Sequence, residues 1–444
     1  MLKRKIEKYL GQWKEAADRK PLVIKGIRQC GKTYIVQKFA TENYESVVYI
    51  NFILEPDKKS AFHGNIDVDT IILNLSALIP GSRFINGKTC IILDEIQECK
   101  EARTSLKSFC IDGRFDIIAT GSLLGVKGYG KTPKKDIDGG QDSVPVGYET
   151  VIEMFPLDFE EFLWANGIND SVIDNVKTCF DNEQAVAEGI HRAMMELLYR
   201  YIIVGGLPEV VNCFIETKNI ELIYNKQRNL ISEYEEDMVK YAADTDKPHI
   251  RECFESIPKQ LAKENKKFFF GQIKKGARSS EFEIAIQWLL DCGLIYKVNR
   301  VNEPHMPLKA YQSMNAYKLF MLDVGLLGAL SELPATSILE GNDIFIEFKG
   351  ALTEQYVLQQ LISDTPYTPY YYGTEKATFE QDFLIQKEAA IIPIEVKAET
   401  NIRSQSLKAY CDKFHPEKAV RFSTLKYMDQ EWMVNIPLYA VCNL

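Results

Sequence analysis

Short apolar runs alternate with amphipathic patterns along the first part of the chain. Four continuous apolar runs are typical of strands buried on both faces of a sheet, at 21–26, 46–52, 88–93 and 115–120. Segments with the 3.6-residue period of helices separate them, such as 66–79 and 100–110. This alternation predicts the α/β class, with a parallel sheet covered by helices on both faces. We expect this domain to span residues 1–200.

The remaining pattern predicts three further segments. Residues 201–248 are mainly helical, and we interpret the interruption at Gly205-Gly206-Leu207-Pro208-Glu209 as a hinge between a core and a lid. Residues 249–330 show a helix, a short apolar piece, a second helix and a strand, the order of a winged helix. Residues 331–444 begin with a long helical pattern followed by two strand patterns, which predicts a second α/β domain.

A glycine-rich segment follows the first apolar run. It reads Gly26-Ile27-Arg28-Gln29-Cys30-Gly31-Lys32-Thr33, which fits G-x-x-x-x-G-K-T and precedes a helical pattern. Glycines allow a turn in which backbone N–H groups point inward, and the helix N-terminus adds partial positive charge. Lys32 would reach the β- and γ-phosphates of ATP, and Thr33 would bind Mg²⁺. A chance turn is the alternative, but the strand before and the helix after favour a phosphate site.

Two later strand patterns end in polar residues. Asp94 and Glu95 end the third run, where Asp94 would hold Mg²⁺ and Glu95 would polarise the water that attacks the γ-phosphate. A helix cap is the alternative for this acidic pair. Thr120 and Ser122 follow the fourth run and would sense the γ-phosphate, with an ordinary turn or N-cap equally compatible. Arg103 and Arg114 are candidate arginine fingers by position only.

Acidic residues and a lysine recur in the last segment. Glu354 falls on the apolar face of a helical pattern, Asp382 lies in a strand pattern, and Glu395 and Lys397 share one face of the next strand. This order is typical of Mg²⁺-dependent nucleases, in which carboxylates hold the metal and the lysine activates water. A strand with a polar outer face is the alternative.

Seven basic side chains precede the second helix of the predicted winged helix: Lys259, Lys263, Lys266, Lys267, Lys274, Lys275 and Arg278. They would contact DNA phosphates or form a solvated face. The segment 127–143 reads as a surface loop, with a phosphate-contacting role for Lys127, Lys131, Lys134 and Lys135 as the minor alternative.

Composition narrows the class only slightly. The 444 residues are 46% hydrophobic and 26% charged, as in ordinary globular proteins, and the net charge of −9 argues against a wholesale nucleic-acid coat. The ten cysteines show no C-x-x-C pattern and predict reduced thiols. With no apolar stretch long enough for a membrane span, we expect a cytoplasmic protein without a membrane partner.

Together, the phosphate motif, Leu93-Asp94-Glu95, Thr120-Gly121-Ser122, Phe155-Pro156-Leu157, the segment 205–209 and Ile394-Glu395-Val396-Lys397 resemble one prokaryotic family. It comprises AAA-type P-loop ATPases whose C-terminal domain of unknown function is restriction-endonuclease-like. The resemblance covers nearly the whole chain, with Cys30 where the family more usually has Val. It implies ATP binding and hydrolysis. Two functions stay open, an ATP-driven DNA-processing enzyme and a signalling-type nucleotide switch, and a homo-oligomer is compatible with both.

Overall fold

The computed structural model describes residues 2–122, 147–242, 244–263, 265–334, 343–373, 379–398 and 403–444. Lys127, Lys131, Lys134 and Lys135 of the predicted surface loop lie outside the described residues. The chain divides into two compact units. The N-terminal unit comprises Lys3–Phe155 and Asp291–Gly293, and the C-terminal unit comprises Met1–Leu2, Pro156–Leu290 and Leu294–Leu444.

The N-terminal unit contains a five-stranded sheet. Its strands are β1 (Leu22–Gly26), β2 (Ser46–Asn51), β3 (Thr89–Asp94), β4 (Asp116–Ser122) and β5 (Thr150–Met154), in the order β2-β3-β4-β1-β5. Every neighbouring pair is parallel, so all five carboxyl ends lie at one edge of the sheet. The predicted α/β fold with a parallel sheet is confirmed.

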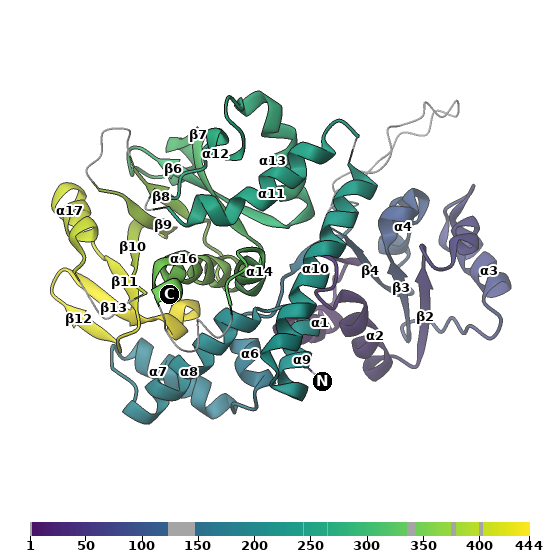
Figure 1. Cartoon of the computed structure of the whole chain (residues 1–444). Helices are drawn as coiled ribbons and strands as arrows, with labels where there is room; N and C mark the ends of the chain where they lie inside the picture. Colours follow the sequence, from purple (N-terminus) through teal and green to yellow (C-terminus); the bar gives the residue numbers. More distant parts are fainter. Residues whose placement is uncertain are drawn as a thin grey trace. The chain divides into compact units, whose positions relative to one another are not determined.

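Helices cover this sheet as the alternating pattern predicts (Figure 1). They are α1 (Lys5–Glu15), α2 (Lys32–Asn43), α3 (Val68–Leu78) and α4 (Lys100–Asp112), with short turns η1 (Pro56–Phe62) and η2 (Ile96–Glu98). α2 contacts β1 to β4, and α1 packs on α2. Another buried cluster joins the strand residues Val23 and Ile91 to Ile71 of α3 and Leu106 of α4. The sheet is thus buried by helices, which explains its continuous apolar strands.

The C-terminal unit combines many helices with a second sheet. The helices are α6 (Phe159–Ala165), α7 (Asp170–Asp181), α8 (Glu188–Val204), α9 (Pro208–Thr217), α10 (Ile220–Tyr241), α11 (Lys247–Leu261), α12 (Phe270–Ile273), α13 (Ser279–Cys292, which ends in the N-terminal unit), α14 (Val324–Leu330), α16 (Asp343–Asp364) and α17 (Gln405–Phe414). Among the described residues, no helix combines the length and apolar character that crossing a bilayer requires.

The second sheet has eight strands in the order β12-β13-β11-β10-β9-β8-β6-β7. They are β6 (Ile295–Val301), β7 (Gln312–Met321), β8 (Tyr370–Tyr372), β9 (Gln381–Lys387), β10 (Ala390–Val396), β11 (Val420–Ser423), β12 (Met428–Gln430) and β13 (Met433–Pro437), with short turns η3 (Leu308–Tyr311) and η4 (Leu438–Asn443). β6 and β7 belong to the predicted winged-helix segment, but β6 pairs in parallel with β8. This sheet therefore crosses the domain boundary that the sequence predicted at residue 330. The prediction missed this because local sequence patterns do not show which distant strands pair.

The segment 205–209, which the sequence predicts to be a hinge, lies within the C-terminal unit. Gly205 and Gly206 are buried, the N–H of Gly206 donates to Asp323 at 2.7 Å, and its carbonyl accepts from Leu157 N at 2.7 Å. A Cβ atom on Gly206 would lie 2.1 Å from the Leu157 carbonyl oxygen. The segment is therefore a packed junction between elements of one unit, in which Gly206 serves close approach and Gly205 has a positive φ of 72°.

Candidate functional site

The turn between β1 and α2 is tightly wound. Gln29 and Gly31 have positive φ values of 65° and 93°, a region that favours glycine. At Gly26, an added Cβ would lie 2.4 Å from the Met154 carbonyl oxygen of β5. Gly26 is therefore required by the close approach of the neighbouring strand, and Gly31 eases the left-handed turn into α2.

Lys32 folds back over this turn. Its side chain is buried, and Nζ donates to the carbonyl oxygens of Gly26 at 2.9 Å and Ile27 at 2.8 Å. The ammonium group is thus positioned at the turn that the motif assigns to phosphate. Among the other predicted cradle residues, Cys30 is buried, Arg28 half-buried and Gln29 exposed.

Asp94 collects hydrogen bonds from three elements at the carboxyl edge of the sheet. Its carboxylate accepts from Thr33 Oγ1 of α2 at 3.1 and 3.2 Å, and from Tyr49 at 2.7 Å and Asn51 at 3.0 Å, both on β2. Thr120 also donates to Asp94, because β4 lies directly beside β3. Burial, with the hydrogen bond to Asp94, raises the pKa of Tyr49 to about 12, so its hydroxyl stays a donor at neutral pH.

The Thr33 and Asp94 pair suits a hard cation. Mg²⁺ prefers oxygen ligands and retains several waters, so one hydroxyl and one carboxylate at this spacing are an appropriate partial ligand set. The structure therefore brings Lys32, Thr33, Asp94 and Thr120 together as the sequence predicted, and their roles stay predictions.

Glu95 lies just beyond Asp94 in a left-handed conformation with φ of 54°. Such a conformation costs a non-glycine residue about 1–2 kcal/mol, and its carboxylate is held by a hydrogen bond from Gln97. Ser122 is paired in register with Gly26 at the end of β4, so it lies next to the start of the glycine-rich turn.

Both candidate arginine fingers are engaged within the N-terminal unit. Arg103 pairs with Glu149 at 2.5 Å, and Arg114 pairs with Asp112 and Asp69 at 2.8 and 2.6 Å. Hydrogen bonds to Asp112 and Asp69 raise the pKa of Arg114.

Sequence reasoning missed several residues of this site. Tyr49 and Asn51 end β2 opposite β3, where Asn51 pairs in register with Asp94. The available signal was two polar residues closing an apolar run beside the strand of Asp94. Arg4 was also missed, because no local pattern connects it with a turn 26 residues away.

The predicted residues of the second site lie on α16, β9 and β10 of the C-terminal unit. Glu354 is buried and pairs with Lys266, whereas Asp382 accepts the N–H of Val396 at 2.8 Å. Glu395 is buried and pairs with Lys397 at 3.0 Å. Extending the antiparallel register from Phe383 and Ile394 places Asp382 opposite Glu395, on one face of the sheet.

The electrostatics of this second site favour added positive charge. Burial raises the pKa of Asp382 to about 7, and the negative charge of Glu354 adds to this, whereas Lys318 and Lys266 act in the opposite direction. Oε2 of Glu354 and Oε2 of Glu395 are buried and have no hydrogen-bond partner among the described residues. Buried carboxylate oxygens without donors fit a cation.

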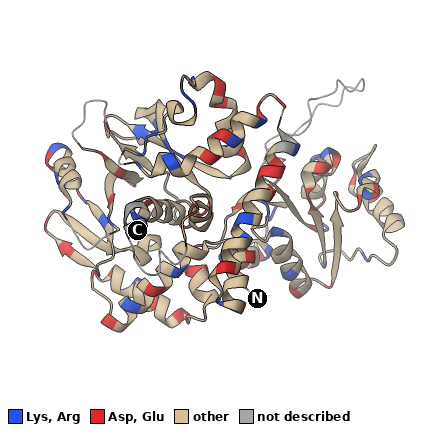
Figure 2. Cartoon of the chain, in the orientation of Figure 1, with Lys and Arg blue, Asp and Glu red and all other residues tan. Residues whose placement is uncertain are grey.

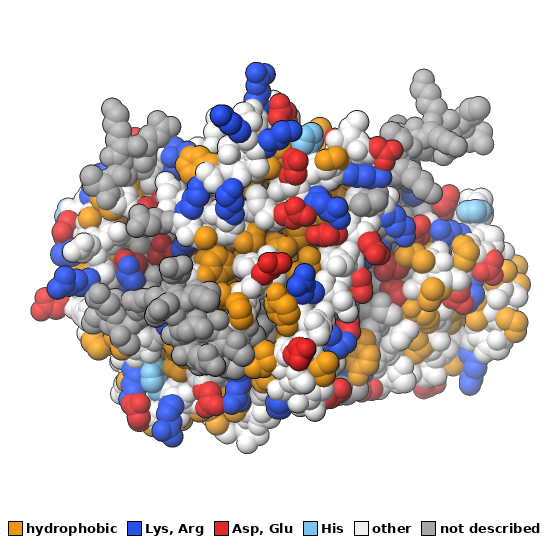
Figure 3. Space-filling view, viewed as in Figure 1, with side chains coloured by type: hydrophobic (Ala, Val, Ile, Leu, Met, Phe, Trp, Pro, Cys, Tyr) orange, Lys and Arg blue, Asp and Glu red, His pale blue; other side chains and the backbone are white. Residues whose placement is uncertain are grey.

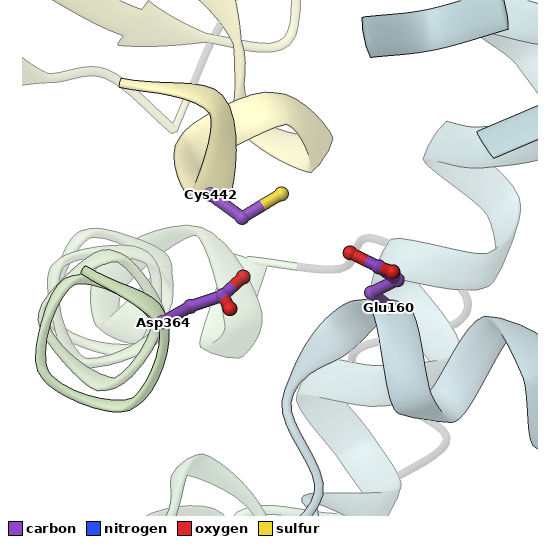
Figure 4. Close-up of side chains that lie close together, drawn as sticks. All are labelled: Glu160, Asp364 and Cys442. Carbon is purple, nitrogen blue, oxygen red and sulfur yellow. The ribbon is translucent and has the colours of Figure 1, made fainter. Parts of the chain in front are cut away.

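These three carboxylates do not form one tight ligand group. Within the described part of the chain, the group of three whose ligand atoms lie within 4.8 Å is Glu160 of α6, Asp364 of α16 and Cys442 near the C-terminus (Figure 4). Proximity alone assigns this trio no role. The metal site at Glu354, Asp382 and Glu395 stays a prediction.

The basic stretch before α13 is only partly available for a ligand. Lys259, Lys274, Lys275 and Arg278 are exposed, but Lys266 is committed to Glu354. Figure 2 shows Lys and Arg near α12 and α13, and Figure 3 shows acidic side chains among the basic ones on this part of the surface. The predicted face is thus smaller than the sequence indicated, because one of its lysines points into the fold.

Comparison with known proteins supports the assignment of the N-terminal unit. Residues 18–163 match the AAA domain. This match supports the prediction that the N-terminal unit is the domain of an AAA-type P-loop ATPase. Residues 195–337 and 349–439 match two domains of unknown function, DUF8612 and DUF4143. No curated protein is significantly similar to the chain.

Several solved structures show limited likeness. A Walker-type ATPase of Pyrococcus abyssi has 16% identity and a TM-score of 0.43, over 74% of this chain and 96% of that one. The Aeropyrum pernix ORC1 protein in complex with DNA has 12% identity and a TM-score of 0.27, over 76% and 92%. AMPPCP-bound DnaA from Aquifex aeolicus has 12% identity and a TM-score of 0.29, over 66% and 90%.

Proposed function

We propose that the N-terminal unit binds ATP and hydrolyses it with Mg²⁺, and that the chain uses this cycle in DNA processing or regulation. The supporting observation is the cluster in which Asp94 accepts from both Thr33 and Thr120 beside the glycine-rich turn. It links the phosphate turn, the predicted metal ligands and the predicted γ-phosphate sensor at one edge of a parallel sheet, where α/β proteins place ligands.

In this proposal, each residue of the site has a distinct role. Backbone N–H groups of the turn hold the phosphates, and Lys32 exchanges its bonds to Gly26 and Ile27 for phosphate oxygens. Mg²⁺, when bound by Thr33 and Asp94, neutralises charge on the β- and γ-phosphates. Glu95 orients the attacking water. Thr120 senses the γ-phosphate, because its hydroxyl donates either to Asp94 or to the phosphate when ATP is bound.

Nucleotide titration tests the binding step. Lys32→Ala removes the phosphate-binding ammonium, so ATP affinity should fall by on the order of ten- to a hundredfold. Lys88→Ala is the matched control, because Lys88 is exposed and pairs with Glu45 on the surface. Circular dichroism establishes that both variants are folded. Equal ATP affinity in Lys32→Ala and the wild type would contradict the assignment of this turn.

A second candidate activity is phosphodiester cleavage in the C-terminal unit. In this proposal, residues 331–444 form a restriction-endonuclease-like domain. The donor-free oxygens of Glu354 and Glu395 and the contact of Lys397 with Glu395 favour it over a site that only binds a partner. Glu354, Asp382 and Glu395 would hold the metal, which activates water and stabilises charge on the phosphate, while Lys397 positions the water.

Cleavage assays separate an enzyme from a binding module. Wild-type protein with Mn²⁺ or Mg²⁺ should cut linear or branched DNA, and Lys397→Ala should lose this activity while retaining ATP hydrolysis. Lys387→Ala on the neighbouring strand is the control, since Lys387 contacts the carbonyl oxygen of Leu444. No cleavage by the wild type on any DNA or RNA tested would favour the nucleotide switch, in which this domain only binds.

A further inference from the structure

Arg4 connects the glycine-rich turn to the end of β5. Arg4 directly precedes α1, and the residue is 7% exposed. Nη1 donates to the carbonyl oxygen of Cys30 at 3.0 Å, and Nη2 donates to the carbonyl oxygen of Phe155 at 2.7 Å. One planar guanidinium therefore joins two backbone segments that are far apart in the sequence, both within the N-terminal unit.

The Cys30 carbonyl lies in the most tightly wound part of the glycine-rich turn. Cys30 stands between Gln29 and Gly31, the two residues with positive φ. Its carbonyl and the N–H of Gly31 belong to one planar trans peptide group and point in opposite directions. By holding the carbonyl on one side, Arg4 fixes the Gly31 N–H in the opposite direction, away from the guanidinium.

The second contact fixes the flank of the same turn. Phe155 directly follows β5, whose Met154 carbonyl oxygen already approaches Gly26 too closely for any Cβ. Gly26 thus sets the packing at the start of the turn, and Arg4 ties its far end to the residue after β5. The loop is restrained at both ends against the same strand.

Arg4 is itself held in place by α1 and α2. Its backbone N–H donates to Oε1 of Glu7 at 3.0 Å, and Glu7 pairs with Lys38 of α2 at 2.5 Å. Lys38 and Glu7 thus hold the Arg4 backbone beside the helix that follows the turn, which restrains the segment that carries the guanidinium. Such anchoring reduces the entropy lost when Arg4 orders the loop.

We propose that Arg4 is a positioning residue of the nucleotide site, which preorganises the backbone cradle for the β-phosphate of nucleoside di- and triphosphates. This inference rests on the proposed ATP binding. Arg4 touches no reacting atom and acts through the Gly31 N–H. Its loss therefore weakens ADP and ATP alike, because both carry the phosphate that the cradle holds.

The test compares ADP and ATP dissociation constants for the full-length wild type, Arg4→Met, Arg4→Lys and Arg19→Met. Arg4→Met keeps the apolar stem and loses the donors, so both constants should rise by on the order of ten- to a hundredfold. Arg4→Lys retains one charged donor group and should recover part of the affinity. Arg19 is the matched control, since it pairs with Asp116 at 2.7 Å at the start of β4, the opposite edge of the sheet.

Four outcomes decide the inference. Weaker binding in Arg4→Met with partial recovery in Arg4→Lys, and unchanged binding in Arg19→Met, supports it, with circular dichroism verifying that each variant is folded. Unchanged ADP and ATP affinity in folded Arg4→Met overturns it while leaving the proposed function intact. Absence of ATP binding in the wild type overturns the proposed function and this inference together. If Arg4→Met does not fold, unchanged affinity in Arg4→Lys overturns the inference, and weakened affinity supports it.

Discussion

Individual residues carry the geometry of the nucleotide site, and Gly26 shows this most directly. Its missing side chain lets β5 approach the turn, since a Cβ would lie 2.4 Å from a backbone oxygen. The sequence predicted glycine here for its backbone freedom, whereas the structure requires it for space. This difference arises because the neighbouring strand lies more than a hundred residues later in the chain.

Gly26→Ala should therefore destabilise the protein by about 1–3 kcal/mol, as overpacking does, and weaken ATP binding. Gly11→Ala is the control, because nothing lies within 4 Å of the added Cβ on α1. That variant should be neutral or stabilise by up to about 1 kcal/mol through helix propensity. Chemical denaturation measures both, and equal stability of the two variants would contradict the close approach.

At Asp382, the raised pKa predicts a pH dependence of stability. The folded state keeps its proton up to about pH 7, whereas an ordinary aspartic acid in the unfolded chain loses it near its usual value of about 4. The folded state thus binds more protons in this window, so stability should fall as pH rises from about 4 to 7. Asp382→Asn should reduce this slope.

The pH dependence of stability is measured by urea unfolding of wild type and Asp382→Asn at several pH values, in the absence of divalent metal. Glu388→Gln serves as a control on the loop between β9 and β10, where the carboxylate is exposed. Equal dependence of the unfolding midpoint on pH in wild type and Asp382→Asn would contradict a protonated Asp382 carboxyl group in the folded state.

At the scale of elements, local patterns predicted helices and strands well and their assembly less well. The strands β1 to β4 lie within one or two residues of the apolar runs, because burial on both faces leaves a continuous signal. The pairing of β6 with β8 and the packing of Gly206 against Leu157 depend on contacts across the chain. No local pattern carries that information, and the hinge expected at 205–209 stays a prediction.

The packed junction at Gly206 has a measurable consequence. Asp323→Ala leaves the buried Gly206 N–H without its acceptor and should lower the free energy of unfolding by about 1–3 kcal/mol. Asp412→Ala removes only an exposed pair with Lys408 and should change stability by less than about 0.5 kcal/mol. Rapid amide exchange at Gly206 in the wild type would instead indicate a mobile hinge.

At the scale of the whole molecule, a net charge of −9 leaves only local basic surfaces for nucleic acid. If the exposed part of the basic stretch binds duplex DNA, Lys274→Glu with Lys275→Glu should weaken binding. The slope of log affinity against log salt should fall by about one for each lysine–phosphate ion pair that the substitutions remove. Binding titrations at several salt concentrations provide both values.

The same change in net charge outside the basic stretch separates a local DNA-binding face from global repulsion. Lys88→Glu with Lys418→Glu supplies this control, because both lysines are exposed and lie outside the basic stretch. Equal affinity and slope for the two double variants would contradict a DNA-binding face at Lys274 and Lys275.

Phosphate release by Glu95→Gln tests whether the N-terminal unit hydrolyses ATP in the proposed way. The variant keeps the size and hydrogen-bonding shape of Glu95 but loses the charge that orients water. It should bind ATP with wild-type affinity while turnover with Mg²⁺ falls by about a hundredfold or more. Equal phosphate release by Glu95→Gln and the wild type would contradict ATP hydrolysis by the proposed arrangement at the edge of this sheet.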